Sequence, residues 1–341
     1  MRFLIKYAYD KDEEAWNTFV SSEPTGTTPY HYYQWRRVIR DTYGLTSKYI
    51  FVEDASGEIK GILPLFFASL GVFSVGVALP YCSHGGIASD GHHIRMILLD
   101  TARSICQEMK LRYIELREVS SLSDRQGLVT QILKLERSIP QQWKKIESRC
   151  RRAVRKAEGN GLKVIEGGME YVKRFYKIYQ QNMTRLGVPF HSIRMFVKVM
   201  EAFGENAVLL MVKKNDEIIA GMLVVKSGCV AYDPWVSSLH SFNRLFPNDL
   251  LYWKAICYAI HNSCHIFDFG KGKIDTGLYC FKKKWRTVDI PLQYTRILLS
   301  GQIQIKRNEL NTVQYIFNNI WSKMPNEINR HVGAYIRKYM L

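Results

Sequence analysis

The sequence lacks the motifs of several common site types. Its seven cysteines are an odd number and form no CxxC pair, so we expect neither a disulfide framework nor a zinc site, and a reducing cytosol fits best. Nine histidines give no HExxH, and the adjacent His92 and His93 point apart on most backbones. The opening stretch MRFLIKYAYDKDEE has early charges and no long apolar region, so we expect no signal peptide.

Acidic residues are few relative to basic ones. The chain has 31 Asp and Glu against 48 Lys and Arg, which gives a formal net charge of +17. Such an excess indicates anionic polymers, anionic lipid surfaces or phosphorylated substrates as partners, with a merely soluble basic protein as the alternative. A length of 341 residues, 47% of them hydrophobic, is enough for a large core and more than one domain.

Nucleotide-binding loops are also missing. The stretch 267–286, FDFGKGKIDTGLYCFKKKWR, contains Gly272 and Gly277 at the spacing of a P-loop, but Leu and Tyr follow where Lys and a hydroxyl residue are needed. The dinucleotide pattern GxGxxG fails because Asp275 stands at the third glycine position. Both motifs are therefore excluded, although the loop remains rich in glycine, lysine and aromatic residues.

One segment has no charge at all. Gly61–Cys82, GILPLFFASLGVFSVGVALPYC, is nearly long enough to span a membrane, but prolines and glycines interrupt it. Its β-branched and aromatic residues flank a Ser-Leu-Gly turn candidate, so we predict two buried strands. A membrane helix and a membrane-dipping hairpin stay open as alternatives.

The two halves of the chain resemble each other. Two hairpin patterns align without gaps, and each carries a glycine at the same offset. The patterns are Val52–Leu63 and Val212–Leu223, with glycines Gly61 and Gly221, and amphipathic helical stretches of equal length, 32–44 and 175–187, precede them. Two such hairpins in matching context predict tandem copies of one mixed α/β (α+β) domain, with chance similarity as the alternative.

A basic segment lies between the copies. In PQQWKKIESRCRRAVRKAEGNG, apolar residues recur at helical spacing from Trp143 to Ala157 while Lys and Arg cover the other positions, and Gly159 and Gly161 end the pattern. This predicts one helix with a buried face and a basic face, which is either solvated or contacts a phosphate backbone.

These patterns divide the chain into four parts. We expect an N-terminal domain at 1–140, the basic connecting helix at 141–161, a C-terminal domain at 162–300, and C-terminal helices at 301–341 that break at Pro325. The C-terminal helices either pack on the N-terminal domain or lie on a membrane surface.

Several blocks in order resemble the FemAB family. They are GILPLFF, LPYCSHGG, RCRRAVRKAEGNGL, NMTRLGVP, FPNDLLYWKAI and FDFG…TGLYCFKKKW…PLQY. This family carries two tandem GNAT-like acyltransferase domains, each a mixed, mostly antiparallel sheet flanked by helices, and it includes the peptidoglycan bridge-forming aminoacyltransferases. The chain looks closest to the subgroup associated with exopolysaccharide and protein sorting.

The resemblance implies an enzyme that transfers an acyl or aminoacyl group to an amine of a cell-envelope or exopolysaccharide precursor. The donor would be a cosubstrate, aminoacyl-tRNA or an acyl-CoA or acyl carrier, with no permanently bound cofactor. The bridge-forming members carry a long helical insertion that binds tRNA, and this chain has none. The closest match to an acyl-CoA pyrophosphate turn, Lys156–Gly161, closes a helix instead of opening one.

Partners and place follow from the same resemblance. We expect an anionic glycan or lipid-linked precursor, with tRNA as a further candidate and no DNA, and a cytoplasmic protein or one peripheral to the inner face of the membrane. Two alternatives stay open: a GNAT N-acyltransferase that depends on acyl-CoA or an acyl carrier, and a catalytically inactive double-GNAT scaffold, which the altered GKGKID loop favours.

The resemblance also implies site residues. Lys282 would handle substrate phosphate or the negative charge of a tetrahedral intermediate, and Asp268 is either a general base or a cap at a strand end. Candidates for substrate binding are Phe281, Tyr279, Lys271, Arg185, Trp285, Tyr232 and His84. Lys271 and Arg286 depart from the family's FDFGRS and FKxxWG patterns. No Ser-His-Asp or Cys-His set is visible, so we expect direct attack of the amine on the donor.

Overall fold

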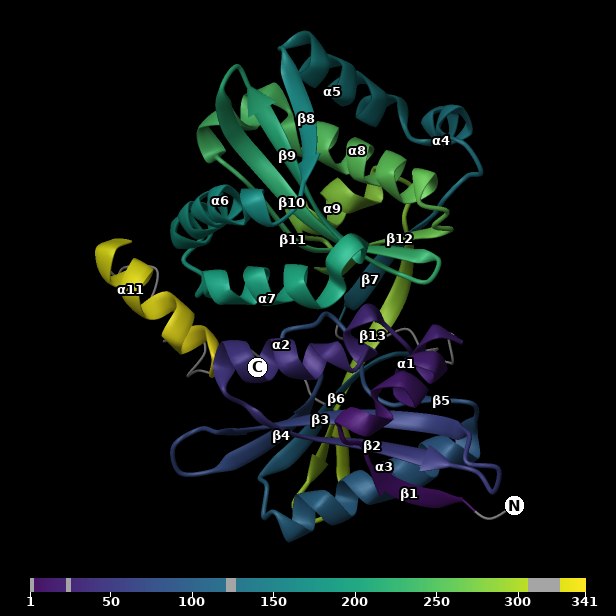
Figure 1. Cartoon of the computed structure of the whole chain (residues 1–341). Helices are drawn as coiled ribbons and strands as arrows, with labels where there is room; N and C mark the ends of the chain where they lie inside the picture. Colours follow the sequence, from purple (N-terminus) through teal and green to yellow (C-terminus); the bar gives the residue numbers. More distant parts are fainter. Residues whose placement is uncertain (1–2, 23–25, 121–126, 306–325) are drawn as a thin grey trace. The chain divides into compact units, whose positions relative to one another are not determined.

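The structure is a computed structural model that describes residues 3–22, 26–120, 127–305 and 326–341. The chain divides into two units (Figure 1). Unit 1 comprises 1–128, 291–308 and 339–341, and unit 2 comprises 129–290 and 309–338. The units divide near residues 128 and 290. The sequence predicts domain limits at 140 and 300 instead.

Unit 1 is a mixed sheet with helices packed on it. Its strands are β1 (Leu4–Tyr7), β2 (Thr46–Glu53), β3 (Ile59–Ser69), β4 (Ser74–Ala78), β5 (Ala88–Ser89), β6 (Tyr113–Val119), β13 (Val288–Leu298) and β14 (Ile303–Ile305), and its helices are α1 (Glu13–Ser21), α2 (Gln34–Tyr43) and α3 (His92–Glu108). The strand order is β1-β2-β3-β4-β6-β13, with β5 on β3 and β14 on β13. Neighbours are antiparallel except β4 and β6.

Unit 2 repeats this plan. Its strands are β7 (Leu128–Lys134), β8 (Leu162–Gly167), β9 (Ala207–Lys214), β10 (Glu217–Ser227), β11 (Val230–Ser238) and β12 (Ile266–Lys273), and its helices are α4 (Ile139–Lys145), α5 (Ser148–Gly159), α6 (Val172–Arg185), α7 (Ile193–Phe203), α8 (Pro247–His261), α9 (Gly277–Lys283) and α11 (Asn326–Arg337). The order is β7-β12-β11-β10-β9-β8, and β11 with β12 is a parallel pair. Short 3₁₀ turns lie at Asp10–Asp12, Pro29–His31, Met169–Tyr171, Gly204–Asn206 and His240–Leu245.

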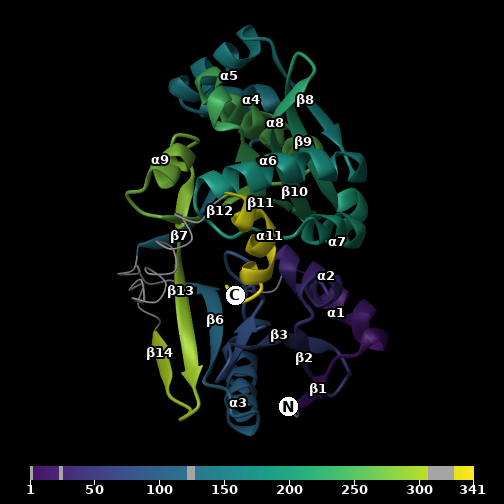
Figure 2. The same cartoon turned by 90° about the vertical axis from the view of Figure 1, so that its left-hand side faces the viewer.

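The predicted repeat is confirmed as a repeat of structure. Each predicted hairpin is an antiparallel pair, β2 with β3 and β9 with β10. The helical stretches before them are α2 and α6, and each buries residues at spacings of three and four, as a surface helix of a globular protein does. Figure 2 shows α6 and α7 packed beside the strands of unit 2.

The charge-free segment forms two strands, as predicted. β3 and β4 pair in antiparallel register from Leu65–Ala78 to Ser69–Ser74, and nearly all of their residues are buried. Among the described residues, no helix is long and apolar enough to cross a membrane.

The two aligned glycines face different helices. A methyl group on Gly61 would lie 2.5 Å from Ile94 of α3, and one on Gly221 would lie 2.7 Å from Phe175 of α6. Gly61 pairs with Val52, whereas Gly221 pairs with Met211, one position before the residue that aligns with Val52. Because side chains alternate along a strand, this offset of one residue turns the two glycines to opposite faces of their sheets.

The basic connecting segment is not one helix, which corrects the prediction. α4 ends at Lys145, and α5 begins at Ser148. Ile146 between them is extended and buried, and the Arg151 guanidinium donates to the carbonyl oxygens of Trp143, Lys144 and Ile146. The break therefore places one more apolar side chain in the core and caps the end of α4 with an arginine from α5.

Part of the C-terminal prediction lies outside the described residues. Residues 306–325 would hold the first predicted helix, and α11 is the second. α11 packs on α6, and a methyl group on Gly333 would lie 2.8 Å from the Phe190 ring, so the helix approaches that ring closely. These contacts are within unit 2, whereas residues 339–341 belong to unit 1.

Candidate functional site

The candidate site begins at a β-bulge in β11. Leu223 of β10 pairs with Trp235, and Val225 pairs with Tyr232, so one residue of β10 faces both Asp233 and Pro234. Proline has no N–H to donate to a sheet, and a bulge is where a strand with neighbours on both sides tolerates it.

Two strands separate at the same place. The parallel pairing of β11 and β12 runs over three residue pairs and ends at Tyr232 opposite Asp268. Among the described strands, only β10 pairs with the rest of β11. Asp233 is therefore the first residue of β11 beyond its pairing with β12, in the fork between the two strands.

Asp233 is the most perturbed carboxylate of this region. Its side chain is buried, and burial raises its pKa to about 7, although the Lys282 ammonium and a hydrogen bond from Tyr252 oppose the rise. Tyr252 Oη donates to Oδ2 at 2.6 Å. The other oxygen, Oδ1, is buried without a hydrogen-bond partner in the part of the chain that the structure describes. A buried acceptor without a donor is costly, so Oδ1 is suited to take a proton or an N–H group.

Asp268 is held by its own surroundings. Its Oδ1 accepts a hydrogen bond of 2.6 Å from Thr130 Oγ1 of β7 and one of 2.7 Å from the backbone N–H of Gly270. These bonds close the turn in which Gly270 has a φ of +69°. Of the two roles that the sequence leaves open for Asp268, these contacts are those of a strand-end cap.

Lys282 lies at the centre of the same turn. Its ammonium donates to the carbonyl oxygens of Phe269, Gly270 and Lys271, the last two at 3.2 and 3.0 Å. An ammonium has three donors, and each is occupied here. Burial lowers the pKa of Lys282, and the charges of Asp233 and Asp268 oppose that shift. Lys282 therefore holds the turn and places a positive charge near both carboxylates, without a hydrogen bond to spare for a substrate.

Aromatic rings line the inner side of the site. Tyr252 of α8 stacks on Phe269 with ring centroids 5.0 Å apart and an angle of 9° between the planes. Phe281 and Trp285 lie 5.4 and 6.3 Å from the same tyrosine ring. These rings exclude water from the tyrosine that binds Asp233, which is one reason why the carboxylate loses solvation.

Ion pairs fix α9, which carries Lys282. Lys284 Nζ binds Asp249 Oδ1 of α8 at 2.5 Å and lies 3.9 Å from the centroid of the Phe281 ring. At the other end of the helix, Thr276 Oγ1 accepts the backbone N–H of Tyr279, whose hydroxyl donates to Asp289. Both ends of this short helix are therefore anchored within unit 2.

The structure brings together only some of the residues expected from the sequence. Lys282, Asp268, Phe281 and Trp285 lie around the fork, and Tyr232 pairs with Asp268 across it. Lys271 contributes its carbonyl oxygen, while its side chain is exposed.

The remaining candidates lie elsewhere. Tyr279 contacts Asp289, and Arg185 is exposed at the end of α6, where it donates to Asn182. His84 belongs to unit 1 and lies 3.1 Å from Ser83 Oγ through Nδ1.

Sequence reasoning missed Asp233 and Tyr252. The one signal for Asp233 is its neighbour Pro234, because a proline inside an otherwise apolar strand pattern indicates a bulge. Nothing in the spacing along the sequence links Asp233 to Tyr252, which lies on a different element 19 residues later. Over the described residues, no cluster of His, Cys, Asp or Glu could hold a metal ion.

A family model matches the part of the chain that holds this site. Residues 144–283 match the family described as acetyltransferase (GNAT) domain. These residues contain β11, β12, α8 and α9, so the matched domain carries the fork and Lys282. The chain has a tandem GNAT-like fold. The matched acetyltransferase domain supports acyl transfer as the chemistry of this part of the chain. The search of curated proteins gave no match.

Solved structures share the tandem fold. The crystal structure of FemX matches with a TM-score of 0.66 at 17% identity, over 85% of this chain and 95% of that one. A tandem GNAT protein from the clavulanic acid biosynthesis pathway gives 0.53 at 10% identity, over 86% and 98%. L-PGS from Bacillus licheniformis gives 0.52 at 10% identity, over 89% and 99%. At these identities the likeness is one of fold.

Proposed function

We propose that this FemAB-like protein transfers an acyl or aminoacyl group to the amine of a cell-envelope or exopolysaccharide precursor, with Asp233 as the group that accepts the amine's proton. The observation that carries the proposal is the Asp233 carboxylate. Its pKa is raised to about 7, and its unpartnered Oδ1 lies in the fork of the matched GNAT domain. A base with a pKa near neutrality is well suited to deprotonate an amine at physiological pH.

The proposed step is direct transfer. The acceptor enters as an ammonium ion, and Asp233 takes one of its protons. The neutral amine then attacks the carbonyl carbon of the donor ester or thioester, so that a C–N bond forms. When the tetrahedral intermediate collapses, the C–O or C–S bond breaks, and the leaving alcohol or thiol takes up the proton that the attacking nitrogen loses. No covalent enzyme intermediate is needed, in keeping with the direct attack expected from the sequence.

Lys282 supports this step from a distance. Because its three donors are held by backbone carbonyl oxygens, it acts through its charge, which favours the ionised form of Asp233. It also holds Gly270 in place. A methyl group on Gly270 would lie 3.7 Å from Asp233 Oδ1, and apart from Gly270 and its two chain neighbours no other atom of the described residues would lie within 4 Å. The missing side chain thus leaves space beside Oδ1, and we assign that space to the acceptor amine.

The charge of the chain supports an anionic acceptor. The net charge of +17 favours a precursor that carries phosphate, and the likeness to FemX supports a cell-envelope substrate. A lipid-linked precursor would be met at the inner face of the membrane. The donor is an aminoacyl-tRNA or an acyl thioester such as acyl-CoA, and the two classes release different products.

A donor test distinguishes these classes. The purified protein is mixed with charged tRNAs and, separately, with acyl-CoAs, in the presence of a lipid precursor that contains an amino sugar. We expect acceptor-dependent loss of the aminoacyl group from tRNA or acceptor-dependent release of free thiol. The absence of both, with a folded protein, would count against the transferase.

The role of Asp233 is tested by Asp233→Asn in the same assay. This change keeps the shape of the side chain and removes its capacity as a base, so we expect transfer to fall at least about 100-fold. Asp216→Asn is the matched control, because Asp216 is fully exposed. An Asp233→Asn variant with the rate of the control would overturn the assignment of the base while leaving the reaction class intact.

A further inference from the structure

Strand β1 has a free edge that is lined by apolar side chains. It is the end strand of its sheet, and in the described part of the chain no strand pairs with its other side. Leu4, Ile5 and Tyr7 are 43, 50 and 41% exposed. Folded proteins normally protect such an edge with charges, prolines or a covering element, because its unpaired N–H and C=O groups can add a further strand.

The register shows which backbone groups point outward. Ala8 donates its N–H to the carbonyl oxygen of Tyr49 at 2.7 Å, and β1 pairs with β2 from Leu4 opposite Glu53 to Tyr7 opposite Ile50. In an antiparallel pair, alternate residues direct their backbone groups to the same neighbour. Leu4, Lys6 and Ala8 therefore bind β2, while Phe3, Ile5 and Tyr7 direct their N–H and C=O groups to the free edge.

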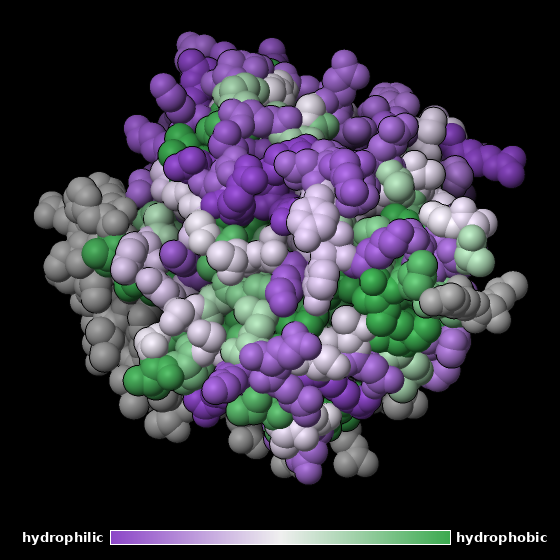
Figure 3. All heavy atoms as spheres, turned by 60° about the horizontal axis from the view of Figure 1, so that its bottom comes forward, coloured by the Kyte–Doolittle hydropathy of each residue, from purple (hydrophilic) through white to green (hydrophobic). Residues whose placement is uncertain are grey.

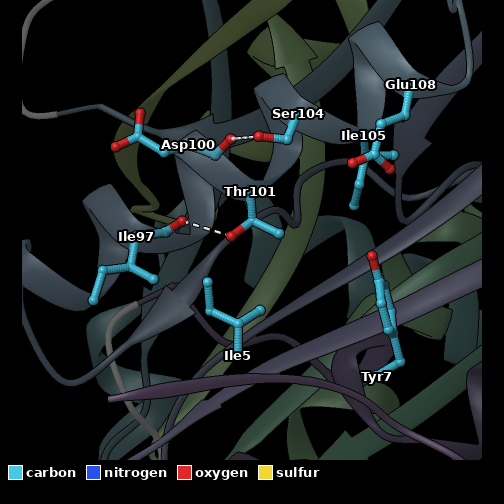
Figure 4. Close-up of a pocket in the computed structure, with 8 residues that line it drawn as sticks. All are labelled: Ile5, Tyr7, Ile97, Asp100, Thr101, Ser104, Ile105 and Glu108. Carbon is cyan, nitrogen blue, oxygen red and sulfur yellow. Dashed lines mark hydrogen bonds between the residues drawn. The ribbon is translucent and has the colours of Figure 1, made fainter. Parts of the chain in front are cut away.

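The same alternate residues point their side chains toward α3. Ile5 and Tyr7 line a hollow of about 420 Å³ together with Ile97 and Ile105 of that helix (Figure 4). Phe3 lies on this side too, with its ring 5.6 Å from that of His93. Figure 3, in which the bottom of the first view comes forward, shows hydrophobic residues at the surface among hydrophilic ones.

We propose that this edge binds a second copy of the chain, with the two β1 strands paired in antiparallel fashion about a two-fold axis at Ile5. Ile5 of one copy then lies opposite Ile5 of the other, and Phe3 lies opposite Tyr7. Every residue with outward backbone groups is paired in this register. On the face toward α3, the side chains of Phe3, Ile5 and Tyr7 from the two copies then form one continuous apolar row. This row lies beside the hollow of each copy.

Self-complementarity favours a second copy as the occupant. In a two-fold interface one patch must match itself, and here a single run of five residues supplies the hydrogen bonds and the apolar face for both partners. Lys6 is ion-paired with Glu53 on the opposite face of the strand, so its charge lies away from the apolar row.

Charge selects the register. A two-fold axis at Lys6 would also pair outward backbone groups, with Ile5 opposite Tyr7. It would, however, place the two Lys6 side chains directly opposite each other, and like charges in that position destabilise a strand pair. With the axis at Ile5, each Lys6 lies opposite Leu4 of the other copy.

Sedimentation velocity of the full-length protein tests the association. An interface of five residues a side is small, so the dimer should be weak and its fraction should rise between about 1 µM and about 300 µM chain. Ile5→Lys places two cations at the two-fold axis and should weaken the dimer at least tenfold. Val72→Lys is the control, because Val72 is 97% exposed at a hairpin tip and lies outside β1. A wild-type chain that stays monomeric throughout, or equal dimerisation of both variants, would overturn the proposal.

Cross-linking tests the register. In a Cys280→Ser background, which removes the exposed native thiol, Ile5→Cys and Lys6→Cys are each treated with a mild oxidant. With the axis at Ile5, the two Cα atoms at position 5 lie about 5.5 Å apart, within disulfide range, whereas the two at position 6 are offset by two residues and lie beyond about 7 Å. We expect a covalent dimer from Ile5→Cys alone. A dimer that cross-links through Lys6→Cys, or through neither residue, would contradict the register. Circular dichroism of each variant confirms that unit 1 is folded.

Discussion

Tyr252 and Asp233 form a hydrogen bond of 2.6 Å between the phenol and one carboxylate oxygen, Oδ2. The tyrosine is on α8, and the aspartate is at the bulge of β11, so the bond joins a helix to the point at which the sheet opens. It holds the carboxylate by one oxygen and leaves the other without a partner among the described residues. Such a carboxylate is oriented and available to accept a proton.

The first prediction concerns the pH dependence of the rate. Because burial raises the pKa of Asp233 to about 7, only a minority of the free enzyme carries the carboxylate at pH 6. We expect kcat/KM for acyl transfer to rise about tenfold per pH unit below this pKa and to level off above it. A rate that is flat between pH 5.5 and pH 8.5 would contradict the role of Asp233 as base.

The second prediction concerns stability. A carboxyl group whose pKa is raised on folding stabilises the folded state fully below the unfolded pKa, about 4, and this contribution is lost as the pH rises through about 7. The asparagine of Asp233→Asn cannot lose a proton, so the variant should not show this loss of stability. The free energy of unfolding of the variant minus that of the wild type should therefore increase by up to about 4 kcal/mol between pH 4 and pH 8. Urea unfolding at several pH values measures the difference, and Asp216→Asn should show no such trend.

The third prediction separates two roles for Lys282. If it acts through its charge, Lys282→Met should move the pH–rate midpoint upward by about 1 unit or more, because the cation lowers the pKa of Asp233. The rate should then recover largely at high pH. A rate that stays low at every pH, with an unshifted midpoint, would show instead that Lys282 contacts the substrate. Unfolding curves are needed alongside, because the ammonium also holds three carbonyl oxygens.

The fourth prediction concerns access to Asp233. Gly270→Ala places a methyl group 3.7 Å from Oδ1, so we expect KM for the acceptor to rise at least about tenfold. Gly44→Ala is the matched control for backbone strain, because Gly44 has a φ of +66° against +69° for Gly270. Among the described residues, no atom beyond its chain neighbours lies within 4 Å of the methyl group that this change would add. Equal acceptor kinetics in the two variants would place the acceptor elsewhere.

The fifth prediction concerns the basic face of α4 and α5. Several of its cations have internal partners: Arg151 caps α4, Arg149 binds Glu147 and Arg155 lies over Trp143. Lys144 and Arg152 are exposed, and reversing both charges to Glu should weaken binding of tRNA at least tenfold.

The salt dependence of the same binding identifies phosphate contacts. Losing two of them should make the log–log dependence of affinity on salt less steep by about 2. The control is the double variant Lys11→Glu with Lys110→Glu, which changes the net charge by the same amount. Both of these lysines are exposed and lie in unit 1. Fluorescence titrations at several salt concentrations measure both quantities, and identical salt slopes for the two double variants would show that this face makes no phosphate contacts.

Much of the fold follows from local pattern. The spacing of apolar residues at three and four predicts α2 and α6, and alternation with turn residues predicts the β2–β3 and β9–β10 hairpins. The glycines and prolines of 61–82 favour strands over a membrane helix, and β3 and β4 confirm it. These features are local, so neighbouring residues contain the information that specifies them.

Other features depend on contacts that no local pattern records. The break between α4 and α5 is stabilised by Arg151, and a difference of one residue in strand pairing turns Gly61 and Gly221 to opposite faces. A buried side chain and a capping arginine act only once tertiary structure has brought them into place.

The sequence by itself determined the tandem domains, most of the strands and helices that build them, and the segment that carries Lys282. Tertiary structure decided the chemistry of the candidate site. Asp233 has a raised pKa because β10, β12 and α8 enclose it. The hydrogen-bond donors of Lys282 are occupied because the turn folds around its ammonium group. Desolvation and the number of occupied hydrogen bonds depend on everything packed around a group, and those neighbours are scattered along the chain.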